Sequence, residues 1–128
     1  MLNFLDLVGR IFISSIFLLS SYNKIFNYGG TVAWMEGFGI PGFLLAPTIV
    51  LEIILPLLII IGYKTRLAAT LLAIFCVSTA TIFHLDFGDQ MQTIQLLKNF
   101  GLAGGFLFIA IHGPKDWAIQ TEKKYVRL

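Results

Sequence analysis

Charged residues and cysteine are both scarce in this sequence. Only 12% of the residues are Asp, Glu, Lys or Arg, whereas 57% are hydrophobic, which is far from the balance of a soluble domain. The net charge of +2 is small and its basic residues are scattered, which argues against nucleic-acid binding. Cys76 is the sole cysteine, so the sequence excludes an internal disulfide, a CxxC pair and a cysteine-rich metal cluster.

Long hydrophobic runs account for most of the chain. A helix that crosses a bilayer needs roughly 20 mainly apolar residues. Four segments meet this requirement, at about 5–24, 43–62, 66–84 and 90–112. We therefore predict an all-α fold, a single four-helix membrane bundle over residues 1–128 with antiparallel neighbours and a basic tail at 113–128.

The connections between the predicted helices differ in length and composition. Residues 62–66 form a tight turn, whereas 27–42 is glycine-rich and long enough for a short interfacial helix that Thr31 would cap, with Trp34 and Phe38 at headgroup level. Asp89 is the expected N-cap of the last helix, and Gly113 with the following proline should end it.

Basic residues predict the orientation of the helices, because cytoplasmic loops are enriched in Lys and Arg. Lys24 and Lys98 fall on one side of the predicted bundle. The other side carries Arg10, Lys64, Arg66, Lys115, Lys123, Lys124 and Arg127. This bias predicts that both termini are cytoplasmic.

Glu52 lies near the middle of the second predicted helix. An ionisable side chain at that depth costs about 2.5 to 3.5 kcal/mol on insertion scales, so it requires a partner or a function. One interpretation is structural: Glu52 pairs with Lys24 or Arg10 and joins the first two helices. The other is that Glu52 belongs to a functional site.

Several further polar residues point to the same region. In the first helix Arg10, Ser14, Phe17, Ser21 and Lys24 follow helical spacing, so they form one stripe that should face the bundle, with Arg10, Ser14 and Ser21 as a structural polar stripe. His84, Lys98 and Asn99 are expected near the same outer end as Lys24. The candidate ligand or proton site therefore comprises Lys24, Glu52, His84, Lys98 and Asn99. No catalytic or metal-binding residue is assigned.

Other residues of the sequence have simpler, structural interpretations. His84 and His112 are both compatible with an interfacial position, and they fall on opposite sides, so they cannot jointly bind one haem within a single chain. Gly101 and Gly105 form a GxxxG pattern, which permits packing on the first helix or dimerisation. Trp117 with Lys123 and Lys124 suggests a headgroup anchor in a solvated tail. Cys76 is expected to be a small apolar filler.

An ordered set of short motifs resembles the DoxX family over nearly the whole chain. These motifs are Gly9-Arg10, Ser20-Ser21 with Lys24-Ile25-Phe26, Leu51-Glu52, the turn from Gly62 to Ala69, Phe83-His84, Gln90-Met91 and Leu97-Lys98-Asn99. The resemblance implies a four-helix membrane bundle, multi-pass in a cell membrane, with the bacterial inner membrane expected. It also implies an association with membrane oxidoreductase complexes. The paired cysteines of vitamin K epoxide reductase-like bundles are missing, which argues against thiol-disulfide chemistry.

Three functions remain open from the sequence. The chain is a quinone-associated membrane subunit of a redox complex, a non-catalytic structural or assembly subunit, or a protein that binds or transports a small amphipathic solute. The family resemblance implies a quinone as the ligand. The sequence carries no recognisable metal, haem, flavin or dinucleotide motif, so electrons would come from a partner and any enzymatic role is that of a subunit. Expected partners are the bilayer and either other membrane subunits or further copies of the chain, and no nucleic acid.

Overall fold

In the computed structural model the described residues are 1–119, and every regular element among them is helical. Four of these helices are long and apolar enough to cross a membrane. The elements are α1 (Leu2–Phe26), α2 (Tyr28–Gly37), a 3-10 turn η1 (Gly42–Leu44), α3 (Leu45–Ile61), α4 (Thr65–Phe83) and α5 (Gln90–His112). This confirms the predicted all-helical membrane architecture. Residues 120–128, with Lys123, Lys124 and Arg127 of the predicted basic tail, lie outside the described part.

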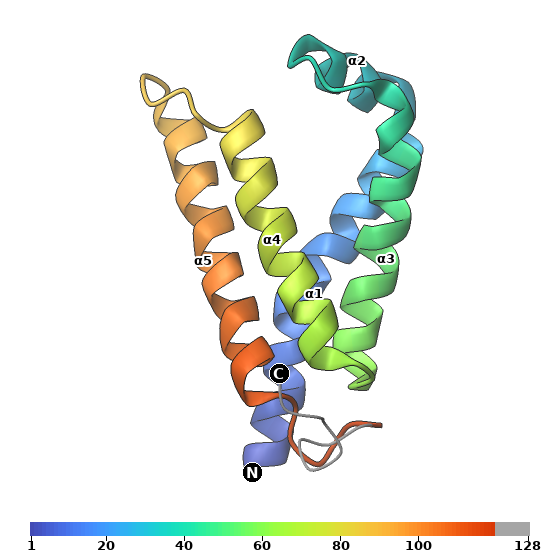
Figure 1. The fold of residues 1–128 in the computed structure, drawn as a ribbon, viewed down its shortest axis with the longest axis vertical. Helices are drawn as coiled ribbons and strands as arrows, with labels where there is room; N and C mark the ends of the chain where they lie inside the picture. Colours follow the sequence, from blue (N-terminus) through green and yellow to red (C-terminus); the bar gives the residue numbers. More distant parts are fainter. Residues whose placement is uncertain (120–128) are drawn as a thin grey trace.

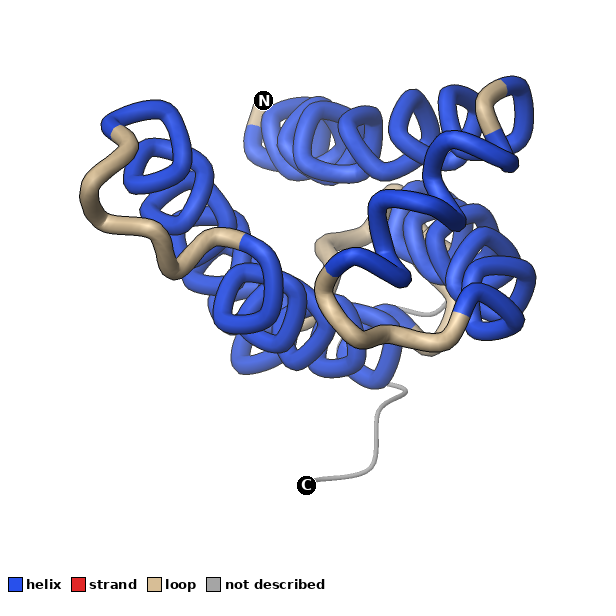
Figure 2. Tube along the Cα trace, turned by 90° about the horizontal axis from the view of Figure 1, so that it is seen from above, coloured by secondary structure: helices blue, strands red, loops and turns tan. Residues whose placement is uncertain are grey.

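The helices form two closely packed pairs (Figure 1). α4 lies along α5, and α1 packs against α3. The pairs meet near the turn between α3 and α4 and diverge toward the opposite end, where α2 crosses the top of the α1–α3 pair. Viewed from that end, the described chain is mostly helix, with loops between the helices and at its ends (Figure 2). The fold therefore has one closed end and one end at which the two pairs separate.

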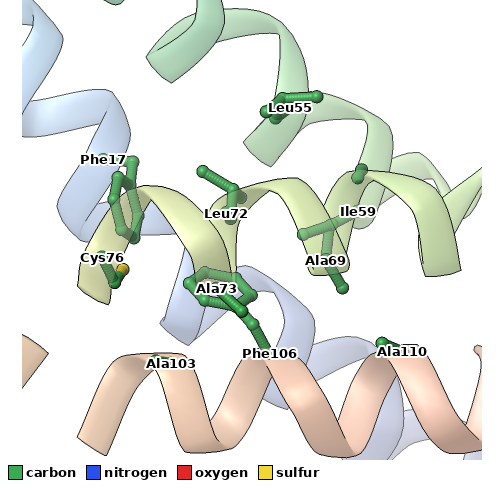
Figure 3. Close-up of a cluster of buried hydrophobic side chains, with 11 residues drawn as sticks. Phe17, Leu55, Ile59, Ala69, Leu72, Ala73, Cys76, Ala103, Phe106 and Ala110 are labelled. Atoms are coloured by element: carbon green, nitrogen blue, oxygen red, sulfur yellow. The ribbon is translucent and has the colours of Figure 1, made fainter. Parts of the chain in front are cut away.

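Small side chains allow α4 and α5 to approach each other closely. Ala69, Ala73 and Cys76 of α4 are buried against Ala103 and Ala110 of α5, as Figure 3 shows. Two aromatic side chains fill the remaining space, with the rings of Phe17 and Phe106 centred 5.5 Å apart. Lipid offers no hydrophobic advantage for helix association. The van der Waals energy of this tight contact therefore holds α4 against α5 and joins both to α1.

Gly105 of the GxxxG pattern faces the inside of the bundle. A methyl group at this position would lie 2.7 Å from the Ile13 side chain of α1, whereas one at Gly101 would meet nothing within 4 Å. Of the two interpretations of the pattern, packing on α1 therefore applies to Gly105.

The ends of α5 follow the sequence prediction. The Asp89 carboxylate accepts a hydrogen bond from the Met91 amide at 3.0 Å, which caps the first turn. The helix ends at His112, and Gly113 follows with a φ of 68°.

α2 begins earlier than the sequence suggests. Thr31 was expected to cap it, but Thr31 lies inside the helix, and its hydroxyl donates to the Asn27 carbonyl at 2.9 Å. Only Asn27 separates α1 from α2, so the chain turns immediately and the capping prediction is wrong. Gly29 and Gly30 lie in the first turn of α2 despite their low helix propensity.

Aromatic rings connect α2 to α4. Trp34 stacks on Phe83 with ring centroids 4.4 Å apart, and Phe38 meets the same ring edge-on at 5.1 Å. These contacts span the diverging end of the bundle.

Candidate functional site

A cavity of about 950 Å³ occupies the end of the bundle where the helix pairs diverge. All five numbered helices contribute to its wall. The five residues predicted as a ligand or proton site all line it: Lys24, Glu52, His84, Lys98 and Asn99. The structure thus brings these residues together, whereas their role in binding stays a prediction.

An ion pair between α1 and α3 forms part of the cavity wall. The Lys24 ammonium donates to Glu52 Oε1 at 2.6 Å. The Lys24 side chain is 24% exposed, whereas that of Glu52 is only 3% exposed. Of the two partners that the sequence allowed for Glu52, the structure selects Lys24. The second carboxylate oxygen, Oε2, has no hydrogen-bond partner among residues 1–119.

His84 stands at the end of α4 and contacts the start of α5. Its Nδ1 lies 2.6 Å from Gln92 Oε1. An amide oxygen can only accept, so this hydrogen bond requires the tautomer with the proton on Nδ1, in which Nε2 of the neutral ring is an acceptor. Gln92 was not singled out from the sequence, because nothing local shows that the α4–α5 loop returns it to His84.

Lys98 and Asn99 reach the cavity from α5. Lys98 is exposed and Asn99 is half-buried. Both follow Asp89, the N-cap of α5, by more than one helical turn. The same wall holds further polar residues, which are Ser20, Asn23, Asn27, Thr31, Thr48, Ser78, Thr79 and Gln95. Of these, Asn23, Asn27, Thr79 and Gln95 were not singled out from the sequence. Asn27 lies three residues after Lys24 and Gln95 three residues before Lys98, so helical spacing from the predicted site residues is the signal that would have found these two.

Comparison with known proteins supplies the family. Residues 5–85, from the first turn of α1 to the end of α4, match the sequence model of the DoxX family. The chain belongs to the DoxX family. This confirms the resemblance that the motifs indicate, and the matched part includes Lys24, Glu52 and His84.

Two relatives of this DoxX protein are described in Escherichia coli. The chain is 39% identical to the inner membrane protein YqjF over 114 residues, which are 89% of this chain and 88% of YqjF. It is 36% identical to the inner membrane protein YphA over 115 residues, covering 84% of this chain and 82% of YphA. No solved structure matches. Together with the four spanning helices, these relatives identify a multi-pass protein of the bacterial inner membrane.

Arg10 of the DoxX chain lies far from the cavity, at the closed end. It is 2% exposed and donates to the carbonyls of Ile59 at 2.9 Å and Ile60 at 2.8 Å, as well as to the Trp117 carbonyl. Its Nε pairs with Asp6 at 3.0 Å. A helix leaves its last carbonyls without donors from its own backbone, so Arg10 supplies donors that cap the C-terminal end of α3.

The segment after α5 is attached to this closed end. The Lys115 amide donates to Asp6 at 3.1 Å, and the Ile119 amide donates to the Ile61 carbonyl at 3.0 Å. Trp117 contacts the Phe4 ring. The amides of Lys115 and Ile119 thus attach this segment to α1 and α3, while the side chains of Lys115, Trp117 and Ile119 are exposed.

The rest of the predicted stripe faces inward. Ser14 and Ser21 are buried on α1, as expected. The Ser21 hydroxyl donates to the Leu18 carbonyl at 2.9 Å, and the Ser14 hydroxyl has no partner in the described range. Cys76 is fully buried in the core as a small apolar side chain, and His112 lies at the opposite end of α5 from the cavity.

Proposed function

We propose that this DoxX-family protein binds a membrane quinone in the cavity and acts as the membrane subunit of a redox-linked complex. One observation carries the proposal: a cavity of about 950 Å³ holds an ion pair and several hydrogen-bond donors between apolar walls. Ligand sites typically combine a largely apolar lining with a few converging polar groups.

The wall chemistry suits a quinone. A quinone carries two carbonyl acceptors on a flat ring and an apolar tail. Lys24, Lys98 and Asn99 supply N–H donors from both helix pairs. Ile16, Phe75 and Leu102 supply apolar surface for the ring and the tail.

The ion pair gives the site a means of handling protons. Reduction of a quinone to a quinol takes up two electrons and two protons. In this proposal Glu52 passes protons to the bound ring, and a partner subunit supplies the electrons, since the sequence has no recognisable cofactor motif.

We also propose an orientation of the protein in the membrane. We place both termini in the cytoplasm and neighbouring spanning helices antiparallel, as the distribution of Lys and Arg predicts. The cavity then lies toward the periplasmic surface.

Co-purification of quinone tests this function. The protein would be extracted in a mild detergent, and its bound lipophilic molecules and polypeptides would be identified by mass spectrometry. We expect one quinone or quinol per site in the unmodified protein, and a loss of most of it in Asn99→Leu and Glu52→Gln. Lys115→Met and Glu36→Gln are the controls. Each removes one charge from an exposed residue outside the cavity, and both variants should retain the ligand.

Other results would contradict the proposal. A stoichiometric polypeptide partner with no quinone, together with unaffected cavity variants, would indicate a structural or assembly subunit. Flux of a small amphipathic solute through liposomes containing the isolated protein would indicate transport.

A further inference from the structure

Glu52 lines the cavity, and one of its carboxylate oxygens has no donor among the described residues. Glu52 Oε1 receives the Lys24 ammonium at 2.6 Å, but Oε2 is buried and has no hydrogen-bond partner among the described residues. A buried acceptor without a donor is costly, because it has lost its hydrogen bonds to water. A ligand that brings a donor to this oxygen would recover that energy.

The two redox forms of the proposed ligand differ in this property. A quinone has two carbonyl oxygens and no donor on its ring, whereas a quinol has two hydroxyl groups that both donate and accept. From this difference we infer that the cavity binds the quinol in preference to the quinone, with one ring hydroxyl donating to Glu52 Oε2. The inference rests on the proposed function, since it names the form of the ligand for the same site.

The surrounding residues fit this selectivity. Glu52 is the only Asp or Glu that lines the cavity among residues 1–119. Lys24 donates to the other oxygen, Oε1, which leaves Oε2 as the carboxylate oxygen without a donor in the described range. The second quinol oxygen can still accept from Lys98 or Asn99 on α5, so both ends of the ring have partners.

Selective binding has a redox consequence. Hydrogen bonds to charged acceptors change affinity by about tenfold or more. A tenfold preference for the quinol raises the two-electron reduction potential of the bound couple by about 30 mV. The site would then favour reduction of the quinone that it holds.

Anaerobic binding measurements test the inference. Decyl-benzoquinone and its reduced benzoquinol would be titrated into the full chain in lipid nanodiscs, with affinity measured by calorimetry. We expect the quinol to bind the unmodified protein about tenfold more tightly. In Glu52→Gln the side-chain amide both donates and accepts, so the preference should fall to less than about twofold. Glu36→Gln is the matched control on an exposed glutamate and should keep the full preference.

The outcomes separate the two proposals. If neither form binds, the quinone function fails and the inference fails with it. If both forms bind with equal affinity, or the quinone binds more tightly, only the inference fails. The comparison in the unmodified protein decides this even if Glu52→Gln does not fold.

Discussion

Lys24 and Glu52 form a pair whose two members differ in their access to water. Glu52 is almost fully buried, whereas Lys24 keeps about a quarter of its side chain exposed. Removal of one partner leaves the other without its counter-charge, and the cost depends on how deeply that remaining charge is buried.

This asymmetry predicts unequal effects of single substitutions. Lys24→Met should lower the free energy of unfolding by roughly 3 kcal/mol, because it isolates a deeply buried carboxylate. Glu52→Gln should cost only about 1 kcal/mol, since Lys24 can turn toward water. Chemical unfolding in detergent measures both, and the double variant Lys24→Met/Glu52→Leu should recover most of the loss. Equal costs for the two single variants would contradict this account.

Arg10 satisfies four acceptors at the closed end of the bundle. Three backbone carbonyls and the Asp6 carboxylate surround its guanidinium. Arg10→Lys should lower the free energy of unfolding by about 2 kcal/mol, because a compact ammonium cannot reach groups arranged around a planar fork. Lys115→Ala, an exposed cation at the same end, is the control and should change stability by less than about 0.5 kcal/mol. An Arg10→Lys variant as stable as this control would show that the fork geometry is not required.

At the scale of the elements, the α3–α4 turn depends on Gly62. Its φ is 78°, and a methyl group there would lie 2.1 Å from the Ala118 Cβ. The turn and the 115–119 segment therefore compete for the same space unless residue 62 is glycine. Lys64 adopts a φ of 49° in the same turn, so the tight connection uses the left-handed region twice.

Gly62→Ala should therefore both strain the turn and displace the segment. The backbone strain alone costs about 1 kcal/mol, and hydrogen exchange at residues 115–119 should become faster as their contacts with α1 and α3 are lost. Gly101→Ala provides the comparison, since that helical position has open space and should be neutral or stabilising by up to about 1 kcal/mol. Unchanged exchange at 115–119 in Gly62→Ala would refute the predicted displacement.

α2 is joined to the α4–α5 pair through its aromatic contacts. Trp34→Ala removes the ring that stacks on Phe83. Hydrogen exchange should increase in residues 28–37 while the α4–α5 pair stays protected, because the core of that pair lies elsewhere. Equal protection of α2 before and after the substitution would show that the stack does not hold it.

At the scale of the whole molecule, the proposed orientation predicts a protease pattern. Epitope tags at both ends of the chain should resist protease in intact spheroplasts and be digested after lysis, because both termini are expected in the cytoplasm. A tag inserted between Asp86 and Gly88 should be digested in both preparations. Digestion of either terminal tag before lysis would overturn the orientation.

Much of this architecture could be predicted from the sequence, because in a bilayer hydropathy and charge are strong constraints. The cost of isolating Glu52 in lipid made a partner necessary, and helical spacing along α1 placed Lys24 in reach. Asp89 and Gly113 carry local capping signals, so the ends of α5 were correct.

The missed features depend on contacts between distant segments. Arg10 bonds to the Trp117 carbonyl, more than a hundred residues away, and a backbone carbonyl leaves no mark in the sequence. The early start of α2 reflects the single residue between it and α1. The size of the cavity results from the divergence of the helix pairs, which no local pattern encodes.

Cys76, the only thiol in the chain, has no surface open to solvent. Its neighbours in the core are the alanines and aromatic rings that join α4 to α5 and α1. A thiol at that position can be alkylated only when these helices come apart. The rate at which N-ethylmaleimide modifies the untouched protein therefore reports how often the bundle opens, without any engineered label.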